Sequence, residues 1–589
     1  MKNFIKYTFA TILGTLITFF VALFIIIGIV SALSAGNEKT VVVKENSVLN
    51  LKLGKVLIDR QPVNPLAKYG VGDEEALTGL NRILQVLKAA KKDDRIEGIY
   101  IDTRNIPNGG IASYEALRKA LLDFKSEGKF IFAYGEYFTQ KDYYIASVAD
   151  KIVLNPVGAV DFKGLSAQIM FFKKAMDKLD IEMQIIRGPN NKFKSAVEPF
   201  MYDQMSEANK EQTHKFISSI WESMLDEIAV SRKMTKAQLT TIADSLWSLN
   251  PKKAKELGLV DMIIYEDQFK DDLMKKVGVS DEENFNEITL TDYATTVHKV
   301  DNVKEKNKIA VIYAIGEIVG GEGDDNIIGS DRIAKAVRKA RQDSSVKAIV
   351  LRVNSPGGSA LASEVMWREL VLAKKEKPVV VSMGNYAASG GYYISCMANK
   401  IFAEPTTITG SIGVFGMIPN LKNFLNNRLG ITFDGVSTNA NSSMGGFSQP
   451  LTPYQHKVIE NSVVDIYTTF INHVAEGRNM TPEQVDAIGQ GRVWSGADAL
   501  KIGLVDELGG LDKALDAAAK LANISSYRIS ERPELKDPFE EMIKKMSGNV
   551  KASIIENQLG TSYKYYDYLK KMRTMEGFQA RLPFFIEIY

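Results

Sequence analysis

The chain has 589 residues, of which 45% are hydrophobic and 24% charged, a composition typical of globular proteins. This composition excludes a largely disordered, collagen-like or multi-pass membrane protein, and the length allows about four ordinary domains or two large ones. The 73 basic and 71 acidic residues give a net charge of +2, so no overall field attracts nucleic acid. The single cysteine, Cys396, excludes an intramolecular disulfide, a cysteine-rich zinc site and an iron–sulfur cluster.

The N-terminal segment predicts a transmembrane anchor over residues 1–36. Residues 9–30 carry no charge, and roughly 20 apolar residues suffice for a membrane-spanning helix. Lys2 and Lys6 precede this run, which favours a cytoplasmic N-terminus. The alternative is a cleaved signal peptide, with small residues at 32–35 near the cleavage site. The length of the apolar run favours a retained anchor.

Two long segments of the chain resemble each other. GLNRILQVLKAAKKDDRIEGI (79–99) corresponds to GSDRIAKAVRKARQDSSVKAI (329–349), and both predict an amphipathic helix followed by a strand. Residues 134–156 correspond to 383–405 without a gap. The matches keep one order and a nearly fixed spacing, which indicates a duplicated domain rather than a short structural repeat.

The fold class predicted for each copy is α/β. In the second copy, KAIVLRV (347–353) and KPVVVSM (377–383) are typical of buried parallel strands. Residues 363–377 predict the crossover helix between them, which completes a βαβ unit.

The domain boundaries follow from these matches. The first copy covers 37–300 and the second 301–540, and the polar stretch 280–305 is interpreted as their connection. The tail, 541–589, contains the aromatic-rich stretch 562–571 and is interpreted as helical, with a role in packing or assembly.

The places where the two copies differ indicate where a site could lie. AASGG (387–391) in the second copy replaces FTQKD (138–142) in the first. Ser389 follows a predicted strand and precedes a helical stretch, the position in which a serine hydroxyl can act as a nucleophile. The alternative is an ordinary helix N-cap serine.

A nucleophilic serine needs a base. None of the four histidines lies in a constrained, glycine-framed motif, which argues against a Ser-His-Asp triad: His214, His298, His456 and His473. A lysine remains as a base if burial lowers its pKa. RGPNNKFKSAVEPF (187–200) of the first copy carries lysines, whereas its counterpart near 436–449 has none. The alternative is that Lys192 and Lys194 are solvated loop lysines.

Four motifs together resemble the long form of the bacterial signal peptide peptidase A (protease IV) family: KSAVEPF (194–200), VNSPGGS (353–359), AASGGYYIS (387–395) and TGSIGVFG (409–416). The resemblance covers nearly the whole chain. It implies a ClpP/crotonase-like α/β domain present twice, and a serine protease that works with a Ser–Lys dyad.

The resemblance also assigns roles to single residues. Ser389 would be the nucleophile, Lys194 the general base, and Ser411 a serine that orients the lysine. Gly358 and Gly390 match positions whose backbone N–H groups line the oxyanion hole. Lys192 lies outside the matched motif and is set aside.

The resemblance further implies the surroundings of the enzyme. The substrates would be cleaved signal peptides, and neither a metal nor a cofactor would be needed. The repeats would lie on the extracytoplasmic side of the bacterial inner membrane, in a homotetramer where serine and lysine converge from neighbouring subunits. Two alternatives remain at this stage: a non-catalytic membrane scaffold of the same fold, and a crotonase-like CoA enzyme.

Overall fold

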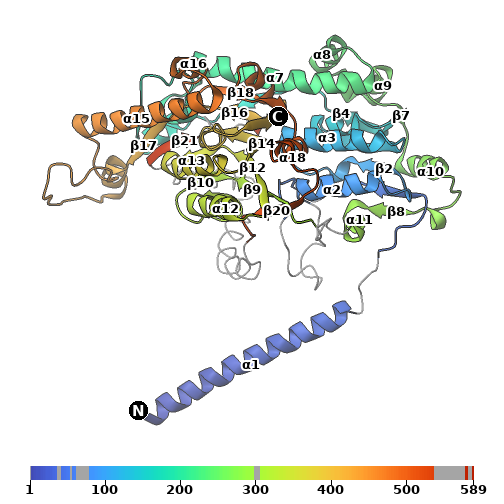
Figure 1. Cartoon of the computed structure of the whole chain (residues 1–589), viewed down its shortest axis with the longest axis horizontal. Helices are drawn as coiled ribbons and strands as arrows, with labels where there is room; N and C mark the ends of the chain where they lie inside the picture. The colour runs from blue at the N-terminus through green and yellow to red at the C-terminus, as the bar shows by residue number, and fades with distance from the viewer. Residues whose placement is uncertain are drawn as a thin grey trace.

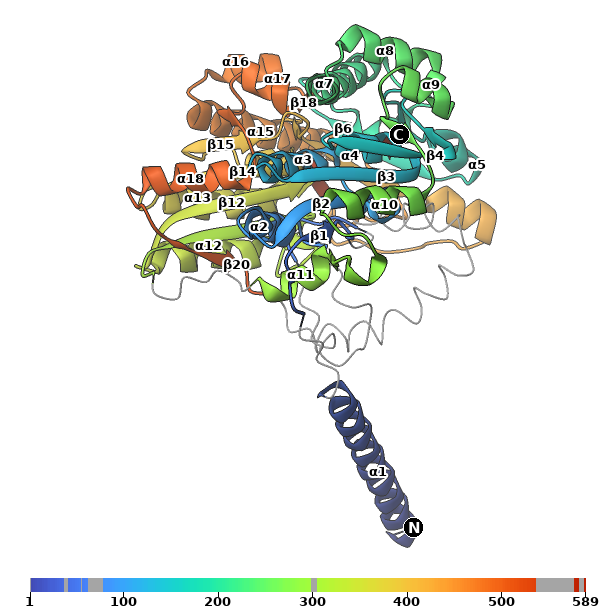
Figure 2. The ribbon, with the colours of Figure 1, turned by 90° about the vertical axis from the view of Figure 1, so that its right-hand side faces the viewer.

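The computed structural model describes the chain except residues 1, 36–40, 54–55, 62–77, 298–304, 536–576, 582–586 and 589. Helix α1 (Lys2–Ala35) stands apart from the rest of the molecule (Figures 1 and 2). Counting only residues that the structure describes, no helix is long and apolar enough to cross a membrane.

The first copy is built on a parallel six-stranded sheet in the order β7-β4-β3-β2-β1-β8. Its strands run in the chain order β1 (Ser47–Asn50), β2 (Ile96–Asp102), β3 (Phe130–Phe138), β4 (Lys151–Val160), β7 (Met262–Ile263) and β8 (Glu287–Thr289). Helices α2 (Leu80–Lys91) and α3 (Ile111–Lys125) connect the first three of them. Figure 2 shows β1, β2 and β3 lying side by side in this sheet.

The stretch 280–305, interpreted as the connection between the copies, also contains elements of the first copy in its described part. Strand β8 and helix α11 (Leu290–Thr296) form within it, and β8 pairs with β1 at the edge of the first sheet. Polar side chains at a sheet edge and on a short helix weaken the periodicity of the sequence, so the pattern predicts neither element.

The second copy repeats the strand order of the first as β19-β15-β14-β12-β9-β20. The strands are β9 (Lys308–Ile315), β12 (Val346–Ser355), β14 (Val379–Ala388), β15 (Lys400–Ala403), β19 (Glu507–Leu508) and β20 (Arg528–Arg532). Helix α12 (Ser330–Gln342) precedes β12, and helix α13 (Ala360–Lys374) crosses from β12 to β14. The predicted α/β class and the βαβ unit are confirmed, because β12 and β14 are parallel and almost wholly buried.

The long helices α7 (Glu207–Arg232) and α15 (Pro453–Arg478) also occupy matching positions in the two copies. Ser206 and Thr452 cap their first turns by accepting backbone N–H groups, and Lys233 and Asn479 end them in the left-handed conformation. Both ends of each helix are thus fixed by the same kind of capping, as expected of a duplicated domain.

A third sheet joins the two copies and the end of the chain, in the order β11-β10-β13-β21-β17-β6. The second copy contributes β10 (Glu317–Val319), β11 (Ile327–Gly329), β13 (Gly357–Ser359) and β17 (Phe415–Asn420), and the first copy contributes β6 (Glu182–Arg187). Strand β21 (Gly577–Arg581) comes from the tail. The tail was interpreted as helical; residues 562–571 lie outside the described part, but the described residues 577–581 are a strand.

Candidate active site

Ser389 sits at the sharp turn between β14 and the short helix α14 (Gly390–Tyr393). Its backbone is in an unusual conformation for a residue other than glycine, with φ 53° and ψ −113°. Its hydroxyl makes no capping hydrogen bond to the helix, and the residue is completely buried. The N-cap alternative is therefore wrong, and the strained turn aims the hydroxyl elsewhere.

The hydroxyl of Ser389 meets Lys194. The Nζ of Lys194 lies 2.9 Å from Oγ of Ser389, 3.0 Å from Oγ of Ser411 and 3.1 Å from the carbonyl oxygen of Ser411. Ser411 is itself held in a left-handed conformation, with φ 50°, and its N–H donates to the carbonyl of Arg492. The structure thus brings together the three side chains that the sequence singled out. Lys192 is exposed and lies over the ring of Phe193 instead.

Burial sets the proton affinity of this lysine. Lys194 is inaccessible to solvent, and the loss of hydration lowers its pKa well below the usual value near 10.5. A lysine in this state is neutral over a wider pH range, so its nitrogen can accept a proton.

Contacts across the two copies hold the Lys194 loop in place. The loop joins β6 to the 3-10 turn η3 (Ser195–Val197), and β6 pairs with β17 of the second copy. Gln212 of α7 donates to the carbonyl of Phe193 and to Ser195, and it accepts the N–H of Val493. The N–H of Phe193 donates to the carbonyl of Gln490.

Gly491 lies against the same loop, and sequence reasoning did not identify it. Its φ is +83°, and a Cβ on Gly491 would stand 2.5 Å from the Cα of Lys194. Only glycine lets the two backbones approach this closely. The only signal in the sequence is the glycine itself, and because the chain has 44 glycines, this signal does not single out Gly491.

Two glycines follow the end of β12 close to the turn that carries Ser389. Gly357 and Gly358 follow β12 with φ of +99° and +154°. A Cβ built on Gly357 would lie 2.8 Å from the backbone nitrogen of Gly390 and 2.2 Å from the carbonyl oxygen of Ala580. The turn therefore places Gly357 and the predicted Gly390 close to the carbonyl oxygen of Ala580, whereas a Cβ on the predicted Gly358 would meet the backbone of Ile318.

One chain is sufficient for the contact between serine and lysine. The first copy supplies Lys194 and the second supplies Ser389 and Ser411, all within a single subunit. The resemblance implied that the two groups converge from neighbouring subunits, and the structure corrects this. The shared sheet explains the difference, because β6 carries the lysine loop directly to the second copy.

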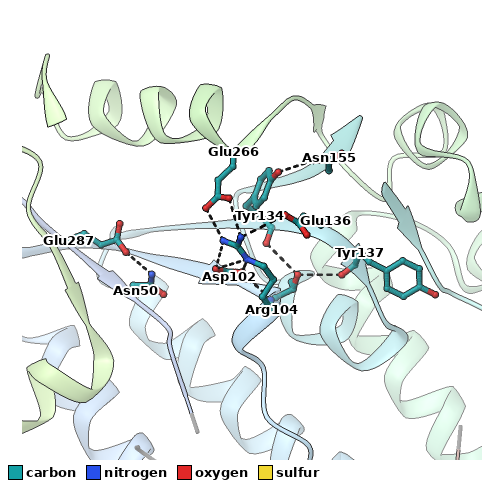
Figure 3. A network of polar contacts seen from close by, with 10 residues as sticks. Asn50, Asp102, Arg104, Tyr134, Glu136, Tyr137, Asn155, Glu266 and Glu287 are labelled. Atoms are coloured by element: carbon teal, nitrogen blue, oxygen red, sulfur yellow. Dashed lines mark hydrogen bonds and ion pairs between the residues drawn. The ribbon is translucent and has the colours of Figure 1, made fainter. Parts of the chain in front are cut away.

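The end of β2 in the first copy carries an ion-pair network, shown in Figure 3, in which the guanidinium of Arg104 lies between Asp102 and Glu266. Arg104 donates to both carboxylates at 2.7 and 2.8 Å. The corresponding strand end in the first copy thus carries charged side chains, whereas the serine and its glycine turn lie in the second copy.

Among the described residues, no group of three or more His, Cys, Asp or Glu side chains is arranged to hold a metal ion. Cys396 is buried, and its Sγ contacts the carbonyl of Tyr393. Burial raises its pKa to about 12, so the thiol is protonated at neutral pH.

Comparison with known proteins identifies the family. The chain matches Peptidase family S49 over residues 123–280 and 372–525, once in each copy. It is 37% identical to Protease 4 of Salmonella typhi over 554 residues, which cover 91% of this chain and 88% of that protein. The chain belongs to peptidase family S49.

As a member of family S49, the chain is a serine peptidase with two tandem family domains. A shorter protein of Enterococcus faecium, named putative signal peptide peptidase SppA, is 31% identical over 43% of this chain and 76% of that protein. Among solved structures, a ClpP1 mutant of Listeria monocytogenes covers 35% of this chain and 94% of its own, with 16% identity and a TM-score of 0.24. Membership of this family removes the two alternatives left open by the sequence, the scaffold and the CoA enzyme.

Proposed function

We propose that this chain is an endopeptidase that cleaves peptides through an acyl-enzyme, with Ser389 as nucleophile and Lys194 as general base and acid. The contact of 2.9 Å between Nζ of Lys194 and Oγ of Ser389 carries the proposal. The complete burial of the lysine supports it, since the loss of hydration lowers its pKa and favours the neutral amine that can act as a base. Each repeat would be a ClpP/crotonase-like domain, which the repeated parallel sheet supports.

The mechanism follows from the positions of these groups. Neutral Lys194 removes the proton of Ser389 as Oγ attacks the carbonyl carbon of the peptide. The N–H groups of Gly358 and Gly390 receive the developing oxyanion, each contributing about 3 kcal/mol to transition-state stabilisation. Lys194 then protonates the leaving amine, and water hydrolyses the ester. Ser411 keeps the lysine nitrogen directed at Ser389 through its hydroxyl and carbonyl oxygens.

Hydrolysis of a fluorogenic peptide tests this proposal. We expect Ser389→Ala and Lys194→Ala each to lower kcat by at least about a thousandfold, because neither group can act without the other. Lys192→Ala is the matched control, since this neighbouring lysine is exposed, and it should keep normal activity. Full activity of Lys194→Ala at pH 8, with a folded protein by circular dichroism, would refute the dyad.

The physiological substrates that we propose are signal peptides left in the membrane after precursor cleavage. The name of the Enterococcus faecium relative and the motif resemblance support this. The uncharged run 9–30 supports a membrane anchor, with the repeats on the extracytoplasmic side of the bacterial inner membrane. Described apolar side chains of α1, including Ile12, Leu16 and Phe20, are exposed and available to lipid.

Fractionation of cells tests the location. The full chain should remain with the membrane after a carbonate wash, and its repeats should be digested by protease added to spheroplasts. Deletion of residues 1–36 should release the protein into the soluble fraction. Recovery of the full chain in the soluble fraction would contradict the anchor. We also propose that the protein is a homotetramer. Light scattering in detergent measures the number of subunits directly.

A further inference from the structure

Gln212 is a buried polar side chain on α7, and its amide is bonded at both the nitrogen and the oxygen. The residue is inaccessible to solvent. Its Nε2 donates to the carbonyl oxygen of Phe193 at 2.9 Å and to Oγ of Ser195 at 2.7 Å, and its Oε1 accepts the N–H of Val493 at 3.2 Å. The three bonds allow the amide one orientation, because turning it would leave buried groups without partners.

Two of these three bonds lie on either side of Lys194. Phe193 and Ser195 are its neighbours in the chain, and both are buried. The amide therefore fixes the backbone from which the lysine side chain extends. The Nζ of Lys194 lies 2.9 Å from Oγ of Ser389, so a displacement of this backbone would move the nitrogen relative to the hydroxyl.

The third bond reaches the second copy, at a strand pair that holds the backbone of Ser389. Strand β18 (Val493–Ser495) pairs antiparallel with β16 (Ile408–Gly410), and Val493 stands opposite Gly410. The carbonyl oxygen of Gly410 accepts the N–H of Ser389 at 2.8 Å. One side chain of the first copy thus contacts both the lysine loop and the strand pair beside the serine.

The matching helix of the second copy has no amide at this position. Helices α7 and α15 begin at the N-caps Ser206 and Thr452, so Gln212 and Val458 occupy the same place in the two helices. Val458 is 38% exposed. The glutamine therefore occurs in the copy that carries the lysine, as expected of a residue that serves the site rather than the duplicated fold.

We propose that Gln212 is a positioning residue, which sets the place of Lys194 relative to Ser389 by tying the lysine loop to the second copy. This inference rests on the proposed function, because it takes Lys194 as the base. The amide does not touch the reacting atoms and acts through the backbone of the lysine loop. Because it bonds to both copies, the base is aligned only while the copies are docked.

Peptide hydrolysis by Gln212→Met tests the proposal, because methionine has a similar length and no amide. We expect kcat to fall by about tenfold or more, since the base is displaced, and KM to change by less than about threefold. Burial lowers the pKa of Lys194, so a loosened loop that admits water should raise this pKa. The acid limb of the kcat/KM profile should then move to higher pH.

Gln212→Glu is a second variant, with the shape of the native side chain. Its ionised carboxylate still accepts the N–H of Val493 but cannot donate to the carbonyl of Phe193. A negative charge beside the loop also favours the protonated form of Lys194. We therefore expect a lower kcat and an acid limb displaced to higher pH.

Gln455→Met is the matched control in the second copy. Gln455 is a buried glutamine in the first turn of α15, and its amide contacts Thr452 and Asn441. Its loss should lower the urea midpoint and leave kcat and the acid limb unchanged. The same result for Gln212→Met would mean a merely structural role and would overturn the proposal.

Two further measurements keep the outcome decisive. If Gln212→Met does not fold by circular dichroism, the decision rests on Gln212→Glu, and native kcat and pH dependence in that variant would overturn the proposal. Lys194→Ala is measured in parallel. Loss of activity in Lys194→Ala with normal Gln212 variants refutes only the positioning role, whereas full activity of Lys194→Ala refutes the dyad itself.

Discussion

Lys194 shows how burial converts an ordinary side chain into a base. The chain has 73 basic residues, and this one is completely enclosed and directed at a serine hydroxyl. The divergence of the two copies identified both residues, because each occurs in only one copy. The burial of the lysine could not be predicted from the sequence, because it depends on residues distant in the chain, such as Gln490 and Gly491.

The lowered pKa of Lys194 predicts the pH dependence of activity. The base must be neutral, so kcat/KM should fall as the pH falls through this pKa and reach a plateau above it. Lys192→Ala should leave the profile unchanged. Lys194→Arg should be inactive at every pH, because a guanidinium stays charged. A profile from pH 5 to 10 that does not change with pH would contradict this role.

Gly491 gives a second prediction at the scale of a single residue. Alanine at this position would place a Cβ 2.5 Å from the backbone of Lys194 and push the lysine away from Ser389. We expect Gly491→Ala to lower kcat roughly 10- to 100-fold with a smaller change in KM, because a displacement near 1 Å can cost about that much. The matched control is Gly430→Ala, which has a positive φ of 67° but no atom within 4 Å of the added Cβ. Equal losses in both variants would mean that backbone strain alone causes the effect.

At the scale of elements, local patterns predict the strands that lie between helices and fail for those that pair only over long distances. Strands β12 and β14 contain short runs of apolar residues and were predicted to within a few positions. Strand β21 contains glycine, glutamine and arginine, and its partners lie more than 150 residues away in the chain. Such a strand shows no periodicity in the sequence, because its neighbouring strands come from distant parts of the chain.

The ion-pair network at the end of β2 (Figure 3) is expected to stabilise this strand end without contributing to catalysis. Arg104 is about half exposed, so solvent screens its pairs with Asp102 and Glu266. We expect Arg104→Met to lower the stability by about 0.5–1 kcal/mol, seen as a lower urea midpoint, with unchanged kcat/KM. Lys210→Met, which removes an exposed pair with Glu207, is the control and should not move the midpoint. A loss of activity in Arg104→Met would show that the first copy contributes more than Lys194.

At the scale of the whole molecule, the site exists only while the two copies stay docked. Asp59 of the first copy forms a buried ion pair of 2.6 Å with Arg352 at the strand end that leads to the glycine turn. Asp59 also accepts a hydrogen bond from Asn354, three residues before Gly357. Arg352 in turn donates to Ser382 and to the carbonyl of Met383 in β14. The same contacts therefore fix the interface and support both strands of the site.

Breaking this ion pair should lower the stability of the protein, and activity should be lost only as the protein unfolds. Asp59→Asn leaves the guanidinium of Arg352 buried without its counter-charge, which we expect to cost about 3–5 kcal/mol. The double variant with Arg352→Gln should lose less than the sum of the two single variants, because the unpaired charge is gone. Urea unfolding of the four proteins measures this coupling, and additive losses would contradict it. On heating, activity in Asp59→Asn should disappear together with the folded signal, because neither copy retains both Lys194 and Ser389 once the interface opens.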